Sequence, residues 1–109
     1  MKKRLFNRVE YYNDKDELHR TDGPAIEYDS GSKYWYVNGI PHREDDLPAK
    51  ERYNGDKYWY LNGKMHRENG PAIILCDGYK QWYLNGVNYK EEEYQEELIK
   101  LKLKRLVNL

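Results

Sequence analysis

The chain has 109 residues with 19 basic and 19 acidic side chains, so its formal net charge is zero. This balance excludes the general basic surplus with which proteins bind nucleic-acid backbones, and the length suits one domain with a modest core. No apolar run approaches the roughly 18 residues of a membrane span, the N-terminal segment lacks the apolar centre of a secretory signal, and Cys76 is the only cysteine. We therefore expect a cytoplasmic protein with no membrane partner, no nucleic-acid partner and no intramolecular disulfide.

A repeat of 23 to 24 residues dominates the chain up to residue 89. Trp35, Trp59 and Trp82 each begin a Trp-Tyr-x-Asn-Gly segment, at intervals of 24 and 23 residues. His-Arg pairs begin at residues 19, 42 and 66, and Pro-Ala pairs begin at residues 24, 48 and 71. Spacing this regular indicates a structural unit used repeatedly rather than a single chemical site. We assign residues 1–89 to one repeat domain, with three Trp-Tyr-x-Asn-Gly units and a first His-Arg half-unit at residues 9–25.

Each unit carries two turn signals, of which Ser30-Gly31 and Asn38-Gly39 are the first examples. Asn-Gly flanked by aromatic and β-branched residues is a strong hairpin signal, because both residues accept positive φ. The sequence therefore predicts a mainly β fold built as an antiparallel repeat sheet. In each unit one strand follows Pro-Ala, a second strand runs through Trp-Tyr, and a short third strand or a loop carries His-Arg.

Alternation of side chains along the Trp-Tyr strands predicts two different sheet faces. The tryptophans share one face with aliphatic residues such as Val37 and Leu61, and we expect this face to be packed. The opposite face carries tyrosines, which suit a half-exposed binding surface. The candidate protein-binding residues are five tyrosines and three basic residues of the middle unit: Tyr34, Tyr36, Tyr58, Tyr60, Tyr83, Arg43, Lys50 and Arg52.

The middle unit departs most from the repeat. It has one extra residue between His42 and Pro48, and Leu47 replaces the glycine that precedes proline in the other units. Lys50 and Arg52 replace residues that are aliphatic or aromatic elsewhere. Two interpretations stay open for this unit: a relaxed structural element, or a site of contact with a partner.

The His-Arg pairs also have two interpretations. Arg20, Arg43 and Arg67 have the fork geometry that matches phosphate oxygens, so a nucleotide or another anion is an alternative ligand. In the structural interpretation the arginines lie across aromatic rings or pair with acids, and the histidines bond to backbone at the junctions between repeats. The candidate acids are Asp22, Glu44 and Glu68.

Metal binding and catalysis have little support in the sequence. Neighbouring strands lie about 4.8 Å apart, so repeats of two or three strands place equivalent histidines roughly 10–14 Å apart. Zinc needs each nitrogen ligand at about 2 Å. Cys76 falls at a strand end and has Asp29 and Tyr53 as its repeat equivalents, which favours a small strand residue over a nucleophile. We expect no metal, no cofactor, no catalytic residue and no enzymatic activity.

After Tyr89 the apolar period changes to that of a helix, predicted at residues 90–109. Asn88 is the expected N-cap, and acidic residues precede basic ones in the order that complements the helix dipole. The apolar face of this helix either caps the sheet or pairs with a second copy in a homodimer. The residues expected to make that contact are Tyr94, Leu98, Leu101 and Leu106.

The segments "WYLNGKMHRENGPA" and "YNDKDELHRTDGPAIEYDSGSKYWYVNG" resemble a known repeat family. They are similar to MORN-variant repeats of the form W-Y-x-N-G-x-x-H-R-x-D-G-P-A, which occur in uncharacterised proteins of phages, giant viruses and bacteria. The resemblance covers residues 9–89. Similarity to ordinary MORN repeats is looser, because those have glycine where this chain has the arginine after each histidine. Ordinary MORN arrays form elongated β-sheets that act as protein-binding or membrane-associated scaffolds, and the resemblance implies no catalytic residues.

These observations predict a non-enzymatic protein-protein interaction module. By the family's occurrence in viruses, the resemblance implies a small phage-type protein that binds and inhibits a host defence protein in the host cytoplasm. Two alternatives remain open: a protein that binds or sequesters a nucleotide or other anion, and a homo-oligomeric structural protein.

Overall fold

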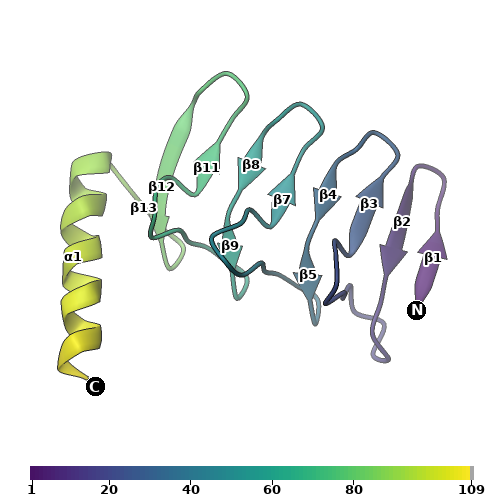
Figure 1. The fold of residues 1–109 in the computed structure, drawn as a ribbon, viewed down its shortest axis with the longest axis horizontal. Coiled ribbons are helices and arrows are strands. Elements are labelled where there is room, and N and C mark those ends of the chain that lie inside the picture. The colour runs from purple at the N-terminus through teal and green to yellow at the C-terminus, as the bar shows by residue number, and fades with distance from the viewer. Residues whose placement is uncertain (109) are drawn as a thin grey trace.

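The computed structural model describes residues 1–108, which form thirteen β-strands and one α-helix (Figure 1). Nine strands make one antiparallel sheet that runs the length of the molecule. In spatial order these strands are β1 (Lys2–Arg4), β2 (Arg8–Tyr11), β3 (Ile26–Tyr28), β4 (Lys33–Tyr34), β7 (Lys50–Glu51), β8 (Lys57–Tyr58), β11 (Ile73–Ile74), β12 (Lys80–Leu84) and β13 (Val87–Tyr89). The predicted mainly β, antiparallel fold with a C-terminal helix is confirmed.

The first two complete repeats each contribute two strands to this main sheet and then fold a small hairpin away from it, whereas in the third repeat β12 continues through Trp82 and pairs with β13 in the main sheet. In the first two complete units these hairpins are β5 (Tyr36–Val37) with β6 (Ile40–Pro41), and β9 (Tyr60–Leu61) with β10 (Lys64–Met65). The chain leaves the main ladder at Trp35 and Trp59, which belong to no strand. The third strand therefore lies just before His-Arg, and the His-Arg pair itself forms an irregular connection.

The Asn-Gly turns have the backbone that the sequence predicts. Asn38 has φ 49° and Gly39 has φ 80°, and the two later Asn-Gly turns repeat these values within a few degrees. Two consecutive residues with positive φ match the right-handed twist of the flanking strands, which is why Asn-Gly is preferred in such hairpins. The turn chemistry therefore fixes where each small hairpin reverses.

The strand register defines the two faces of the main sheet, because directly paired residues in antiparallel strands share a face. One row runs across the sheet through Ile26, Tyr34, Lys50, Tyr58, Ile73 and Gln81. The adjacent row lies on the opposite face and runs through Glu27, Lys33, Glu51, Lys57, Ile74 and Lys80. Directly opposed acids and bases stabilise the second row, from Glu27 to Lys57.

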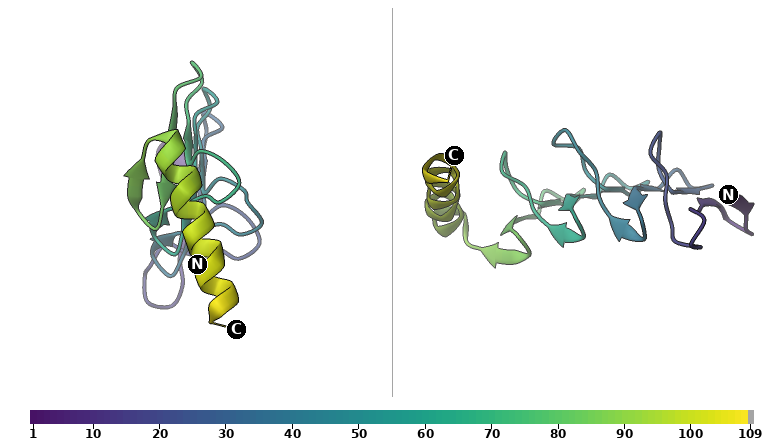
Figure 2. Two further views of the ribbon diagram at one scale, coloured as in Figure 1. Left: turned by 90° about the vertical axis from the view of Figure 1, so that its left-hand side faces the viewer. Right: turned by 90° about the horizontal axis from the view of Figure 1, so that it is seen from below.

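The molecule is a thin plate of 46 × 36 × 18 Å, with the strands side by side and the helix at one end (Figure 2). Ala25, Ala49 and Ala72 of the Pro-Ala pairs are completely buried. Trp59 is 6 % exposed, whereas Trp35 and Trp82 are only half-buried. The expectation of a packed tryptophan face is therefore met fully only at Trp59, because no second layer of sheet covers that face.

The helix α1 (Glu91–Val107) packs against the last strands, β12 and β13. Tyr94 and Leu98 are buried against Leu84, and Leu101 is half-buried beside them. Leu106 differs from the expectation, since it is 66 % exposed and lies outside this contact. It belongs instead to an exposed apolar row on the other side of the helix, together with Ile99 and Leu103.

Asn88 is not the N-cap of the helix, so that prediction was wrong. Asn88 pairs with Tyr83 in the β12–β13 ladder, and its side chain donates to Gln81 and to the carbonyl of Trp82. The N-cap is Lys90, which makes no side-chain capping bond. Acidic residues in the first turn, Glu91–Glu93, provide the negative charge that the helix N-terminus favours.

Within residues 1–108, no helix is both long and apolar enough to cross a membrane.

Gly63 is expected to be the most sensitive of the Asn-Gly glycines. It has φ 83°, and a Cβ added there would overlap Cγ2 of Ile40 in the preceding repeat. Gly86 has a similar φ of 84°, but a Cβ added there would lie 3.8 Å from Cβ of Lys64, an ordinary van der Waals contact. In thermal unfolding, Gly86→Ala should lower stability by about 1–2 kcal/mol from backbone strain alone. Gly63→Ala should cost clearly more, and equal losses would contradict close packing between these repeats.

Candidate functional site

Four tyrosines surround a lysine on one face of the plate. Lys50 Nζ lies 5.2 Å from the ring centroid of Tyr60, 5.3 Å from that of Tyr34 and 5.9 Å from that of Tyr36. Tyr58 is the direct cross-strand partner of Lys50. We call this surface the tyrosine face and define it by Tyr34, Tyr36, Lys50, Tyr58, Tyr60 and Tyr83, all half-buried. An ammonium group against aromatic rings is a stabilising arrangement.

The tyrosine rings are held by one another and by the sheet. The rings of Tyr28 and Tyr34 meet edge to face, with centroids 5.3 Å apart and planes at 65°. Burial raises the pKa of Tyr36, and the neighbouring Tyr34 raises it further. The Tyr36 phenol is therefore neutral at physiological pH, so the face offers hydroxyl donors and apolar ring surface together.

Lys50 and Arg52 take the places that aliphatic and aromatic residues hold in the neighbouring repeats. Lys50 corresponds to Ile26, and Arg52 corresponds to Tyr28. Among residues 1–108 neither side chain forms an ion pair with a carboxylate. The pKa of Asp56 is lowered first by a hydrogen bond from the backbone N–H of Cys76 and only last by the charge of Arg52.

Arg43, the third basic residue predicted for this surface, lies on the opposite face. Its guanidinium carbon stacks 3.6 Å from the ring centroid of Trp35. Its Nη1 donates to the carbonyl of Pro48 and to Glu51 Oε1, both at 3.0 Å. The structure thus brings Lys50 among the tyrosines, leaves Arg52 exposed directly after β7, and places Arg43 away from them.

The other two repeat arginines are engaged in the same way. Arg20 stacks 3.9 Å from the Tyr11 ring and donates to Asp22 and Glu27 at 2.9 and 2.8 Å. Arg67 stacks 3.9 Å from the Trp59 ring, and its Nε donates to the Asp46 carboxylate at 2.9 Å. An external anion would have to displace a carboxylate at each guanidinium.

The acids expected beside the arginines are therefore only partly the ones found. Asp22 pairs with Arg20, as predicted. Glu44 and Glu68 bond instead to the histidines of their own units, His42 and His66, at 2.9 Å. Arg43 pairs with Glu51, which lies farther along the chain, and Arg67 pairs with Asp46, which lies in the preceding repeat.

The histidines join each repeat to the next, as the structural interpretation predicted. In all three junctions the Nδ1 atom accepts a hydrogen bond of 2.9 Å from the backbone N–H of the asparagine in the next Asn-Gly turn. The pairs are His19 with Asn38, His42 with Asn62, and His66 with Asn85. An accepting Nδ1 requires the neutral imidazole with its proton on Nε2, and in His42 and His66 that Nε2–H donates to glutamate.

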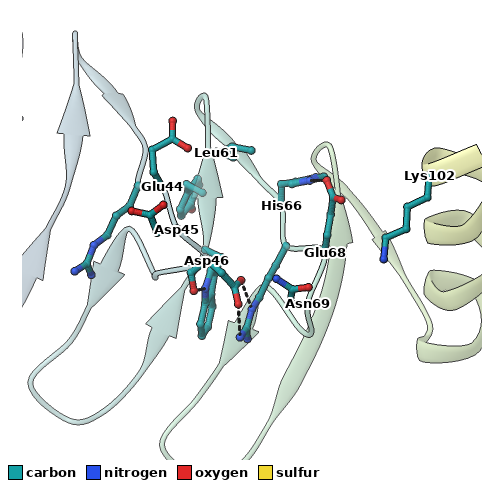
Figure 3. A pocket seen from close by; sticks show the side chains of 12 residues that line it. Glu44, Asp45, Asp46, Leu61, His66, Glu68, Asn69 and Lys102 are labelled. Atoms are coloured by element: carbon teal, nitrogen blue, oxygen red, sulfur yellow. Dashed lines mark hydrogen bonds and ion pairs between the residues drawn. The ribbon is translucent and has the colours of Figure 1, made fainter. Parts of the chain in front are cut away.

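The inserted residue of the middle unit has an architectural role. Asp45 and Asp46 both have positive φ, of 64° and 57°, and this turn carries the loop over the next repeat. There the Asp46 carbonyl accepts a 3.1 Å bond from Trp59 Nε1, while its carboxylate binds Arg67. Figure 3 shows Asp46 and Glu68 beside the resulting cleft of about 260 Å³, with Lys102 reaching toward it from the helix.

Two further features bear on reactive chemistry, metal-binding clusters and Cys76. Residues 1–108 hold no cluster of three or more His, Cys, Asp or Glu side chains able to bind a metal ion. Cys76 is exposed, and a hydrogen bond to Asp56 raises the pKa of its thiol. A raised thiol pKa lowers the thiolate fraction and argues against a nucleophilic role.

Three exposed aromatic residues that we did not predict lie at or near the hairpin tips along one edge of the plate. Phe6, between β1 and β2, is 99 % exposed. Tyr53 precedes the Asn54-Gly55 turn, and Tyr79 follows the Asp77-Gly78 turn and accepts a bond from Gln81. The sequence marks the two tyrosines as exceptions, because each is aromatic where the other repeats are not. Asp29 and Cys76 are the repeat equivalents of Tyr53, and Ser32 and Asp56 are those of Tyr79.

Comparison of the chain with protein-family models, with curated proteins and with solved structures finds no match in any of the three. The similarity to MORN-variant repeats therefore stays a prediction from the repeat motif.

Removing the acceptor at a junction is expected to destabilise the array. His66→Leu removes the Nδ1 acceptor of the Asn85 N–H, which should lower the free energy of unfolding by about 1–3 kcal/mol in urea denaturation. His66→Asn places an oxygen near the former Nδ1 position and should recover part of the loss. Equal destabilisation by the two variants would show that ring packing, rather than the acceptor, makes the junction.

Glu68 should give the protein an acid-sensitive contribution to stability. The Arg105 guanidinium, with bonds of 2.7 and 2.5 Å, lowers the pKa of Glu68 from 4.5 to about 2, against the opposing effect of partial burial. Because the folded-state pKa is depressed, this contribution is complete above about pH 4.5 and disappears as the pH falls toward 2.

In urea denaturation, Glu68→Gln should therefore be less stable than the native chain near neutral pH, and the difference should shrink below pH 4.5. Glu97→Gln removes only an exposed pair with Lys100 and should have little effect. A Glu68→Gln difference that stays constant down to pH 2 would contradict the assignment.

Proposed function

We propose that this chain is a non-enzymatic protein-binding module that contacts its partner through the tyrosine face. The observation that carries the proposal is the cluster of half-buried tyrosines around Lys50 on a sheet face with no second layer of sheet. Tyrosine is favoured at protein interfaces because its ring buries a large apolar area at low entropic cost while the hydroxyl remains a donor.

The geometry of the remaining candidate residues also supports binding over catalysis. The repeat arginines and histidines are occupied by internal bonds, so they serve the array rather than a ligand. For the same reason the nucleotide or anion alternative has weaker support. The finer proposal, a small phage-type protein that inhibits a host defence protein, rests on the MORN-variant resemblance.

Self-association is a second candidate that a specific observation favours. Ile99, Leu103 and Leu106 form an apolar row on α1 and are all more than half exposed. A homodimer through this row would leave the tyrosine face free. Leu98 and Leu101 are poor probes of it, because they pack within the chain.

Capture experiments test the tyrosine face directly. With the purified protein immobilised in a host-cell lysate, Tyr58→Ala combined with Tyr60→Ala should reduce the specifically captured protein at least tenfold, since two central aromatic anchors are lost. The matched control is Lys33→Ala with Lys57→Ala, which changes two residues on the opposite face of the main sheet, in β4 and β8. Both variants must unfold near the temperature of the native protein.

Undiminished capture by the tyrosine variant, or equal loss with the lysine control, would reject the tyrosine face as the binding surface.

A further inference from the structure

Two positive charges on and beside the tyrosine face have no carboxylate partner, whereas the arginines that lie along the sheet are paired. Lys33 and Lys57 of the opposite face also have no carboxylate within 4.0 Å among residues 1–108, but they are exposed to solvent, whereas Lys50 is half-buried. Arg8 pairs with Glu10 at 2.7 Å, and the three repeat arginines each bind a carboxylate. On the opposite face acids and bases alternate from Glu27 to Lys57. Within residues 1–108, Lys50 and Arg52 are the cations of β7 and its turn, and neither has a carboxylate within 4.0 Å.

Among the described residues, the environment of Lys50 supplies aromatic rings but no carboxylate. The residue is half-buried, and its ammonium group lies among three aromatic rings in place of the isoleucine found in the neighbouring repeats. The ring contacts stabilise the ammonium group, but they supply no hydrogen-bond acceptor of charge −1. A carboxylate placed there would bind in a partly desolvated site, where a charge-assisted bond is stronger than in water.

The spacing of the two cations restricts what can bind both. Lys50 and Arg52 are two residues apart on an extended chain, so their side chains leave the same face about 6–7 Å apart. Two acidic residues separated by one residue in an extended peptide have the same spacing and direction. Tyr34, Tyr58 and Tyr60 flank this pair and offer ring surface to neighbouring apolar side chains of the ligand.

We propose that the partner presents an extended acidic segment of the form Asp/Glu-x-Asp/Glu to the tyrosine face. One carboxylate accepts hydrogen bonds from the Lys50 ammonium group, and the other accepts them from the Arg52 guanidinium. This inference rests on the proposed protein-binding function and adds the chemistry of the partner. A nucleic acid has phosphates at comparable spacing, but two unpaired cations on a chain of zero net charge supply little of the charge neutralisation that backbone binding needs.

Selection from a random peptide library displayed on phage tests the proposal with the full chain as bait. Selected peptides should be enriched in acidic residues at positions i and i+2, beside aromatic or aliphatic residues. A labelled peptide of that kind should bind the native protein at low salt and weaken as salt rises. Lys50→Ile combined with Arg52→Tyr introduces the residues that the first repeat carries, Ile26 and Tyr28, and should weaken binding at least tenfold.

The control variant is Lys33→Ile, which removes a lysine from the opposite face and should change affinity less than twofold. A selection that returns no binders or no excess of acidic residues overturns the proposal, as does binding that survives Lys50→Ile with Arg52→Tyr. Peptides without acids whose binding requires Tyr58 and Tyr60 would overturn this inference while leaving the proposed function intact. Tighter binding of a labelled oligothymidine, lost in the same double variant, would overturn it in favour of nucleic acid.

Discussion

The hydrogen bond from a backbone N–H to a neutral histidine ring is the contact on which this array depends. At each junction the imidazole of one repeat receives the asparagine N–H of the next Asn-Gly turn. That turn has positive φ at both residues. The histidine thereby joins one repeat to the next at the small hairpin, which does not belong to the main sheet in the first two complete repeats. The arginine that follows the histidine stacks on a neighbouring aromatic ring.

This arrangement assigns different tasks to the two sides of the plate. On the tryptophan side, guanidiniums stack on Trp35 and Trp59, and each of these arginines also binds a carboxylate. On the tyrosine face the rings remain half-exposed, and the middle repeat places two unpaired cations among or beside them. The contrast directs the search for function to the tyrosine face, since internal contacts already account for most of the polar groups on the other side.

The two ends of the array are closed by different means. At the C-terminal end α1 takes the place of a further His-Arg connection: Tyr94 and Leu98 cover the last repeat, the Tyr94 hydroxyl donates to the Arg67 carbonyl at 2.6 Å, and Arg105 binds Glu68. At the other end β1 is an edge strand of sequence Lys-Lys-Arg, and charge of this kind discourages pairing with another sheet.

The sequence by itself determined the repeat, its turns, the alternation of faces and the histidine junctions. These follow from spacing and from local backbone preferences that are the same in every unit. Tertiary structure decided which groups meet across repeats. Asp46 rather than Glu68 binds Arg67, because the inserted loop reaches over the next tryptophan. Arg43 lies away from the tyrosines, Asn88 joins a strand, and Leu106 faces solvent. Each of these outcomes depends on contacts between residues of different units or between helix and sheet, and a one-dimensional pattern carries no information on how far such a loop or helix will extend.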